Sequence, residues 1–432
     1  MKYLMFIMLF LMGLQVQMKV QAHEEHTMPQ KSNLAISVAF DAQGKLWRAS
    51  VKDGFVQVDA SNDLGKSFSK PVQVNKSAQK IGADGEARPK IAIGPEGHIY
   101  LTWTEALKTP FSGYIWFARS INAGKSFENP QIVHTDRAEI THRFDALHVA
   151  PNGKITVTWV DKRDLLAAKA GNKKYDGAAI YYASSNDKGA SFVPEQKLAD
   201  NSCECCRIVT TNKPDGTVVA MWRHVFEGGE RDHMMAEIPV PVVRQAHHER
   251  KLNDKQQKSD VRPELVEGQA VKTHRATFGH WKIDGCPHHG AALAAGGVGK
   301  DWWGYHMAYF DGNDAASKYG PGLYYSRMDG VAWASSPAKK FGNNNNQAGH
   351  PAILSVSGAK DEEHVWLVWR EVEAKNSKIM GMFSDNGGRN WNDAKVLANV
   401  SVKADYPALI SQANRVYLSW NTANGYQLIP LN

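Results

Sequence analysis

A short motif recurs along the chain and constrains the fold more than any other feature of the sequence. It has the form S-x-D-x-G-x-x-[FW], and its copies begin at Ser61, Ser120, Ser185, Ser326 and Ser384. An Asp or Asn side chain can bind nearby backbone N–H groups and fix a turn, and Gly tolerates a positive φ. One copy defines only a hairpin loop, whereas five copies at regular spacing indicate a repeat architecture.

A second repeated phrase consists of a strand, a turn and a strand that ends near a tryptophan. Its β-branched and aromatic residues are typical of strands. Copies open near Leu34, Arg88, Arg143, Arg207, Gly290, His350 and Tyr406. The phrase therefore predicts seven units. The last unit lacks a clear fourth strand, and we expect the residues just after His23 to supply it. The recurring tryptophans are Trp103, Trp159, Trp222, Trp369 and Trp420, and their regular position argues for packing within the units.

The S-x-D-x-G motif resembles the Asp-box, or BNR, repeat of the sialidase superfamily. In that family the box joins the two outer strands of a β-propeller blade. The resemblance covers nearly all of the mature chain and implies an all-β, single-domain β-propeller over residues 23–432. Sialidases proper have six blades, whereas the repeats here favour seven, so we expect a six- or seven-bladed propeller. The 36 Gly and the 13 Trp, 14 Tyr and 15 Phe suit short strands joined by tight turns.

The N-terminal 22 residues have the pattern of a secretory leader. Lys2 precedes an apolar run from Tyr3 to Leu14, and Val20-Gln21-Ala22 offers small residues for cleavage. The run is short for a membrane span, and no later segment is apolar enough to be one. A buried N-terminal helix is the alternative. We therefore expect an exported bacterial protein, periplasmic or secreted. The net charge of +7 comes from scattered residues, which argues against nucleic acid as a partner.

One interval between motif copies is too long for the repeat. The copies at Ser185 and Ser326 are 141 residues apart, whereas the other gaps are 58 to 65 residues. Within this interval, residues 241–250 and 261–268 resemble translated bacterial repetitive palindromic elements. We predict that residues 239–271 form a flexible insertion at the outer edge of blade four. His247 and His248 belong to this segment, so we do not interpret them as a metal site.

The propeller topology predicts which side chains surround the central channel. In each blade, the first strand begins and the second strand ends beside the central channel. The first-strand candidates are Glu86, Arg88, His142, Arg143, Arg207, His288, His289, His350, Asp405 and Tyr406. The second-strand candidates are Glu105, Asp161, Arg163, Arg223, His224, Asp311, Arg370 and Glu371.

The resemblance to sialidases implies roles for some of these residues. Sialidases use an arginine cluster for the substrate carboxylate, a tyrosine nucleophile activated by a glutamate, and an aspartic acid/base. Tyr406 resembles the nucleophile, with Glu105 or Glu371 as its partner and Asp84 as the acid. The substrate-binding set would be Arg88, Arg143, Arg207, Arg370, Asp161 and His350. The family's x-R-x-P motif ahead of the first blade is absent, and Arg88-Pro89 is only a loose echo of it. The alternative is that these residues form ion pairs that stabilise blade contacts.

The cysteines form the second constellation. Cys203, Cys205 and Cys206 precede the first strand of the fourth unit, and Cys286, His288 and His289 precede that of the fifth. Adjacent blades are expected to bring the two groups together. Disulfides among the four Cys suit an exported protein. A copper(I) or zinc site made of thiolates and imidazoles is the alternative.

The sequence thus favours an exported, sialidase-like propeller that binds or hydrolyses a glycan at its channel, as an exo-glycosidase does. One alternative is a periplasmic Cys/His metal-binding propeller in metal handling or redox. The other is a non-catalytic scaffold for protein–protein interaction.

Overall fold

The structure is a computed structural model, which divides into units 1–32 and 33–432. It describes residues 34–239, 271–283, 288–297, 301–312, 320–358 and 362–431. The predicted leader, the residues just after His23, Cys286 and nearly all of the predicted insertion lie outside these ranges. Everything below concerns the second unit.

Seven antiparallel sheets follow one another along the chain, and in each the strands lie in sequence order. Blade 1 comprises β1 (Ser37–Phe40), β2 (Leu46–Lys52), β3 (Phe55–Ser61) and β4 (Val72–Gln73). Blade 2 comprises β5 (Lys90–Ile93), β6 (Ile99–Ala106), β7 (Gly113–Ser120) and β8 (Gln131–Ile132). Blade 3 comprises β9 (His142–Val149), β10 (Ile155–Asp161), β11 (Ala178–Ser185) and β12 (Gln196–Ser202), and blade 4 comprises β13 (Val209–Asn212), β14 (Val218–Arg223), β15 (His233–Glu237) and β16 (Thr273–Arg275). Blade 5 comprises β17 (Ala292–Gly296), β18 (Gly304–Asp311), β19 (Gly322–Asp329) and β20 (Lys339–Phe341). Blade 6 comprises β21 (Gly349–Ser357), β22 (Glu363–Glu373), β23 (Asn376–Ser384) and β24 (Lys395–Val400). Blade 7 comprises β25 (Ala408–Gln412), β26 (Arg415–Thr422) and β27 (Gly425–Leu431).

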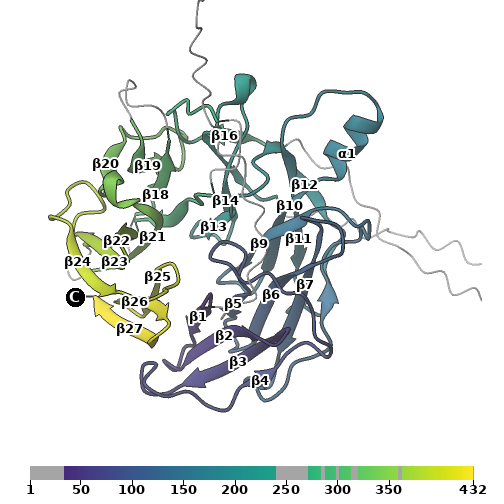
Figure 1. Cartoon of the computed structure of the whole chain (residues 1–432), viewed down its shortest axis with the longest axis horizontal. Coiled ribbons are helices and arrows are strands. Elements are labelled where there is room, and N and C mark those ends of the chain that lie inside the picture. Colours follow the sequence, from purple (N-terminus) through teal and green to yellow (C-terminus); the bar gives the residue numbers. More distant parts are fainter. Residues whose placement is uncertain are drawn as a thin grey trace, which may run out of the picture. The chain divides into compact units, whose positions relative to one another are not determined.

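The innermost strands contact one another in a closed ring. β1, β5, β9, β13, β17, β21 and β25 each touch the next, and β25 returns to β1 (Figure 1). This closed order makes the second unit a seven-bladed β-propeller. The prediction of an all-β propeller is confirmed, and of the two blade counts seven is the correct one. Blade 7 has three strands among the described residues.

The second strand of each blade forms much of the buried core. Every residue of β10 and β14 is buried. The recurring tryptophans Trp103, Trp159, Trp222, Trp369 and Trp420 are at most 1% exposed, so their predicted packing role is confirmed. Several of their indole N–H groups donate to a polar group near a strand end. For example, Trp159 donates to Asp161 at 2.9 Å and Trp369 donates to Glu371 at 2.8 Å. A large apolar ring and one satisfied donor anchor these blades.

The repeated S-x-D-x-G turn closes the link between the third and fourth strands. In blade 1, Ser61 donates to Asp63 at 2.7 Å, while the backbone N–H groups of Gly65 and Ser67 donate to Ser61 and Asp63. Gly65 has φ +82°, which explains why Gly occupies this position. The same bonds recur around Asn122, Asp187 and Asn386.

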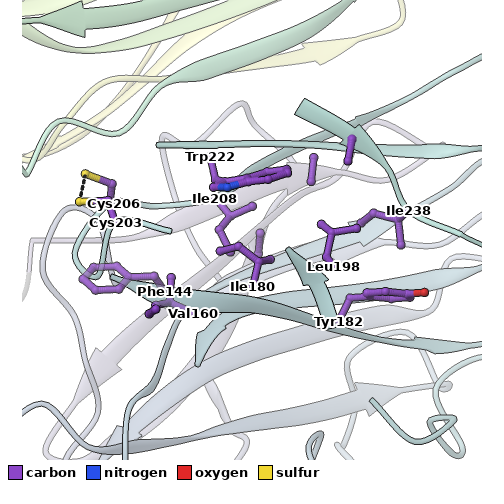
Figure 2. Packing of buried hydrophobic residues seen from close by; sticks show 14 of the residues in the cluster. Phe144, Val160, Ile180, Tyr182, Leu198, Cys203, Cys206, Ile208, Trp222 and Ile238 are labelled. Carbon is purple, nitrogen blue, oxygen red and sulfur yellow. Dashed lines mark hydrogen bonds between the residues drawn. The ribbon is translucent and has the colours of Figure 1, made fainter. Parts of the chain in front are cut away.

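Neighbouring blades pack through apolar clusters, and six such clusters join blades 1 to 7 in succession among the described residues. Figure 2 shows the cluster between blades 3 and 4, with two cysteines at one end beside Phe144. The seam between blades 7 and 1 differs. There Phe40 packs on Tyr417 and Phe68 packs on Tyr426, with ring centres 5.5 and 5.6 Å apart.

The remaining elements lie between strands. Helix α1 (Arg163–Ala170) follows β10, and short 3-10 turns occupy Glu227–Gly229 and Asn344–Asn346. Among the described residues no helix has the length and apolar character needed to cross a membrane. The predicted insertion lies between β15 and β16, which pair through Ala236 and Thr273. Val271, at its predicted end, packs against the blade 3–4 cluster.

Candidate active site at the channel mouth

Tyr406 and His350 stack face to face where blades 6 and 7 meet. Their ring centres are 3.5 Å apart and the planes differ by 10°. Tyr406 lies just before β25, and His350 lies in a bulge at the start of β21, where the register shifts between Gly349 and Ala352. His350 has φ +52°, a conformation that is uncommon outside Gly. Bulges re-aim side chains near binding sites, and this one turns His350 toward Tyr406.

Glu86, in the loop before β5, connects this stack to blade 4. Its Oε1 accepts a hydrogen bond from His350 Nδ1 at 3.0 Å, and its Oε2 lies 3.6 Å from Arg207 Nε. Burial by itself raises the pKa of Glu86, but Arg207 and the His350 hydrogen bond lower it to about 2 overall. Burial lowers the pKa of His350, against the opposing effect of Glu86. Glu86 is therefore a buried carboxylate that binds Arg207 through an ion pair and His350 through a hydrogen bond.

The loop that carries Glu86 is shaped to receive Tyr406. The Asp84 carboxylate accepts from the backbone N–H groups of Glu86 and Ala87 at 3.0 and 2.8 Å, which fixes a tight turn. Gly85, between Asp84 and Glu86 in the chain, lies so close to Tyr406 that a Cβ atom on it would be 1.9 Å from Tyr406 Cε2. The backbone of Gly85 and the ring of His350 thus hold Tyr406. Asp84 itself is exposed.

The tyrosine is surrounded by charged groups. Burial raises the pKa of Tyr406, and the field of Glu86 adds to the rise, while Arg370 opposes it. The Arg370 guanidinium lies 5.8 Å from the Tyr406 ring centre. Tyr406 therefore carries a protonated hydroxyl in this arrangement, and it would need a base or a bound ligand before it could act as a nucleophile.

The predicted arginines have different surroundings. Arg88 forms two 2.6 Å bonds to Asp405 and also donates to the Gly85 and Ile36 carbonyls. Arg207 donates to the carbonyls of Ala291 and Pro351, both at 3.0 Å.

The other two predicted arginines contact aromatic rings or a serine. Arg143 lies over the rings of Phe111 and Phe144. Arg370 donates to Ser377 at 3.1 Å. Arg88, Arg207 and Arg370 therefore gather around Glu86 and Tyr406.

Among the residues that the structure describes, three buried polar atoms of this cluster have no hydrogen-bond partner. They are Glu86 Oε2, His289 Nδ1 and Arg370 Nε, contributed by three different blades or the loops before them. The His289 ring lies 5.5 Å from the His350 ring and stacks on Phe310 at 4.1 Å. Buried polar atoms are normally satisfied by protein, water or ligand. We call Glu86, His289, His350, Arg370 and Tyr406 the channel cluster.

Three predicted carboxylates are placed elsewhere. Glu371 accepts from the Trp369 indole and from the backbone N–H of Asn343. Glu105 accepts from the Trp116 indole at 2.7 Å. Asp161 accepts from the Trp159 indole and from Arg163. Each of these contacts lies within or beside the carboxylate's own blade. The carboxylate that reaches the Tyr406 stack is Glu86, which the sequence placed at the channel without giving it a role.

The thiols form a separate group beside blade 4. Cys203 Sγ lies 3.6 Å from Cys205 Sγ and 3.8 Å from Cys206 Sγ, whereas a disulfide bond is about 2.05 Å long. In the described part of the chain, this grouping of possible ligands holds the three thiols and neither His288 nor His289. His289 instead joins the channel cluster. Pairing with Cys286 stays a prediction, because Cys286 lies outside the described residues.

The fold and the channel cluster define a seven-bladed propeller with a charged, aromatic channel mouth. No protein-family profile and no curated protein matches the chain. Among solved structures, it is similar to a polysaccharide lyase named as an ulvan lyase, at 12% identity over 91% of both chains with a TM-score of 0.50. It is also similar to a Hadza microbial sialidase (11% identity, 88% of this chain and 74% of that one, TM-score 0.45) and to a Penicillium chrysogenum alpha-L-arabinanase (15%, 79% and 91%, 0.46). At 12% identity the similarity to the lyase shows the propeller fold alone.

Proposed function

We propose that this protein is an exported glycan-binding propeller, and that its channel mouth takes the end of an oligosaccharide that carries a carboxylate. The observation that carries the proposal is the set of buried polar atoms in the channel cluster that lack a hydrogen-bond partner among the described residues. Arg370 Nε offers a donor, Glu86 Oε2 an acceptor, and His289 Nδ1 can serve as either. A sugar ring presents hydroxyl groups of both kinds, so it can satisfy all three.

The acidic part of the proposal rests on Arg370. Arg88 is already paired with Asp405, and Arg207 lies against Glu86. The positive charges of these two arginines are therefore largely compensated. In the described residues Arg370 has no ion pair, and its guanidinium faces the Tyr406 ring. A planar guanidinium binds a carboxylate through two parallel hydrogen bonds. Arg370 is thus the group we assign to the carboxylate of the ligand.

Binding is tested by calorimetric titration of the purified full chain with three probes. Two probes carry a carboxylate, an oligosaccharide ending in sialic acid and one ending in glucuronic acid; lactose is the neutral probe. We expect at least one acidic probe to bind at least tenfold more tightly than lactose. Arg370→Ala should abolish this preference, whereas Arg415→Ala, which removes the same charge from an exposed position of β26, should not. Equal affinity for acidic and neutral probes would remove the role of Arg370, and no binding of any probe would remove the function.

Hydrolysis is the finer form of the proposal. In it Glu86, whose charge acts on Tyr406, takes the phenol proton as the Tyr406 oxygen attacks the anomeric carbon. The glycosidic C–O bond breaks and Asp84, exposed on the adjacent turn, protonates the leaving oxygen. Water, deprotonated by Asp84, then hydrolyses the tyrosyl intermediate, and Glu86 returns the proton to Tyr406. Release of a chromophore from an aryl sialoside or aryl glucuronide tests this form. Turnover that is lost in Tyr406→Phe, with probe affinity retained, supports it. Binding without turnover of either substrate would leave a non-catalytic glycan-binding protein.

Export is part of the proposal and has its own test. The leader pattern predicts a mature chain that begins at His23. N-terminal sequencing of protein recovered from a periplasmic or culture fraction should find this start. A chain that retains Met1 and remains in the cell would contradict it.

A further inference from the structure

The thiol cluster, defined as Cys203, Cys205 and Cys206, is not used by the channel function. All three side chains are buried, at 3%, 6% and 3% exposure. They lie in the short segment between β12 and β13 and belong to the apolar cluster that joins blades 3 and 4. Figure 2 shows Cys203 and Cys206 at one end of this cluster. Single buried cysteines are common in apolar cores, but here three sulfurs lie within 4.8 Å of one another, which brings three soft donor atoms to one point.

The spacing of the sulfurs matches a shared metal ion. Two sulfurs bound to one ion at about 2.3 Å lie about 3.8 Å apart at a tetrahedral angle and about 4.0 Å apart in a trigonal plane. The measured separations from Cys203 are 3.6 and 3.8 Å, and all three sulfurs lie within 4.8 Å of one another. A single ion can therefore contact the three sulfurs with little movement of the backbone.

The segment that carries the thiols is held in place by backbone contacts. Cys203 N–H donates to the Arg223 carbonyl at 2.8 Å, and Ser202 forms a bridge with His224. These bonds join the segment to the end of β14. A preorganised loop binds an ion without a large loss of conformational entropy, as metal sites on rigid elements require.

A buried cation lies beside the sulfurs. Arg223 is 2% exposed, and its positive charge acts on both Cys203 and Cys206. Its Nη atoms donate to the Arg231, His289 and Phe310 carbonyls, whereas its Nε is buried without a partner. Three thiolates with a monovalent ion carry two net negative charges, and Arg223 offsets one of them.

The other grouping of possible ligands in the described residues has a different character. Glu230, Asp232 and His280 lie together, but Arg275 forms ion pairs with both carboxylates. An arginine already occupies the position that a cation would take. The thiol cluster contains no such internal cation among its own members.

We propose that Cys203, Cys205 and Cys206 bind one copper(I) ion through their thiolates. Soft thiolate ligands select copper(I) and zinc among the common metals. The described grouping consists of three sulfur atoms, the soft donor type that copper(I) prefers. The site is separate from the channel cluster, so failure of the glycan function leaves this proposal intact.

The test is a copper(I) titration of the reduced full chain, without oxygen, in competition with bicinchoninate. We expect one copper(I) per chain to be withdrawn from the chelator and an X-ray absorption spectrum with sulfur neighbours only. Cys203→Ser should lose the ion. Glu204→Gln is the matched control from the same segment, because Glu204 is directed to Lys162, and it should keep one ion per chain.

A second measurement guards against misfolding of the Cys203 variant. Copper loading of the wild-type chain should protect three thiols from alkylation, located by peptide mass mapping at positions 203, 205 and 206. Failure to compete with bicinchoninate would overturn the proposal. So would copper bound by nitrogen or oxygen, or stoichiometric zinc in preference to copper. An obligatory disulfide between two of these cysteines that resists reduction in the folded chain would do the same.

Discussion

Arg88 and Asp405 form a two-branched ion pair across 317 positions of sequence, with both branches at 2.6 Å. Arg88 precedes the first strand of blade 2 and Asp405 precedes that of blade 7. Arg88 also binds the Ile36 carbonyl of blade 1, so one side chain joins three blades at the place where the ring closes. The side chains are 12% and 4% exposed, so the pair is largely desolvated.

We expect Arg88→Ala to destabilise the propeller by about 3–5 kcal/mol, because it leaves the Asp405 carboxylate buried without its partner. Urea denaturation of the two proteins measures this difference. Arg88→Ala combined with Asp405→Asn should cost less than the sum of the single changes, since no carboxylate remains to be compensated. Additive effects would show that the two residues do not interact energetically.

Glu86 should make stability depend on pH in the acid range. Its pKa is about 2 in the folded chain and about 4.5 in the unfolded chain, so its contribution is fully present above pH 4.5 and is lost as the pH falls toward 2. The contribution is about 3 kcal/mol. Burial raises the pKa of Asp405, which acts in the opposite direction, so the prediction concerns the difference between wild type and Glu86→Gln.

The measurement for Glu86 is denaturant unfolding at a series of pH values from 2.5 to 6. The stability advantage of wild type over Glu86→Gln should shrink as the pH is lowered. Glu128→Gln, at an exposed ion pair with Arg119, is the control and should run parallel to wild type. A constant difference between wild type and Glu86→Gln would mean that folding does not change the pKa of Glu86.

Gly85→Ala should damage the channel cluster. The added Cβ would lie 1.9 Å from Tyr406 Cε2, so the ring must leave its stack on His350. We expect loss of probe binding of tenfold or more in calorimetry. Gly171→Ala is the matched change, because a Cβ there has only ordinary contacts at 3.6 Å or more, and it should retain binding. Unchanged affinity in Gly85→Ala would show that the position of Tyr406 does not matter for the ligand.

The turn motif predicts an asymmetry between two substitutions of Asp187. Its carboxylate accepts bonds from Ser185 and from the backbone and hydroxyl of Ser191. Asp187→Ala removes these bonds and should cost about 1 kcal/mol, seen as a lower thermal midpoint. Asp187→Asn should cost less, because Asn122 and Asn386 already hold the equivalent turns. Equal losses in both variants would show that the Asn turns owe their stability to something other than this amide.

Deletion of residues 241–268 should leave the thermal transition in place. The strands that flank the segment, β15 and β16, pair through Ala236 and Thr273, so a short Gly-rich turn can replace it. The deletion retains Ile238 and Val271, which pack in the blade 3–4 cluster. Extending it to 239–271 removes Val271 and should lower the midpoint. Loss of cooperative unfolding in the shorter deletion would show that the segment belongs to the fold.

Much of the fold follows from local chemistry that is visible in the sequence. The turn at Ser61–Ser67 depends on residues within six positions of one another, and the indole of Trp159 finds its acceptor two residues later. Such features repeat with the sequence, so the seven units and the channel-facing strand starts were predictable. Helix α1 was not predicted, because it lies in an irregular link between strands.

The site shows where the sequence reaches its limit. It placed Tyr406, His350, Arg88 and Arg207 at the channel, but it gave the partner role to Glu105 or Glu371 and not to Glu86. Carboxylates at equivalent repeat positions look alike in sequence. Glu371 binds the indole of Trp369, two residues away, whereas only the tertiary structure brings Glu86 to His350, which lies 264 positions away. The sequence by itself determined the blades, because short-range hydrogen bonds and strand pattern specify them. Closure of the ring decided which residues meet in the channel cluster and in the Arg88–Asp405 pair. These residues come from blades that are distant in sequence, and no local interaction specifies how those blades are placed.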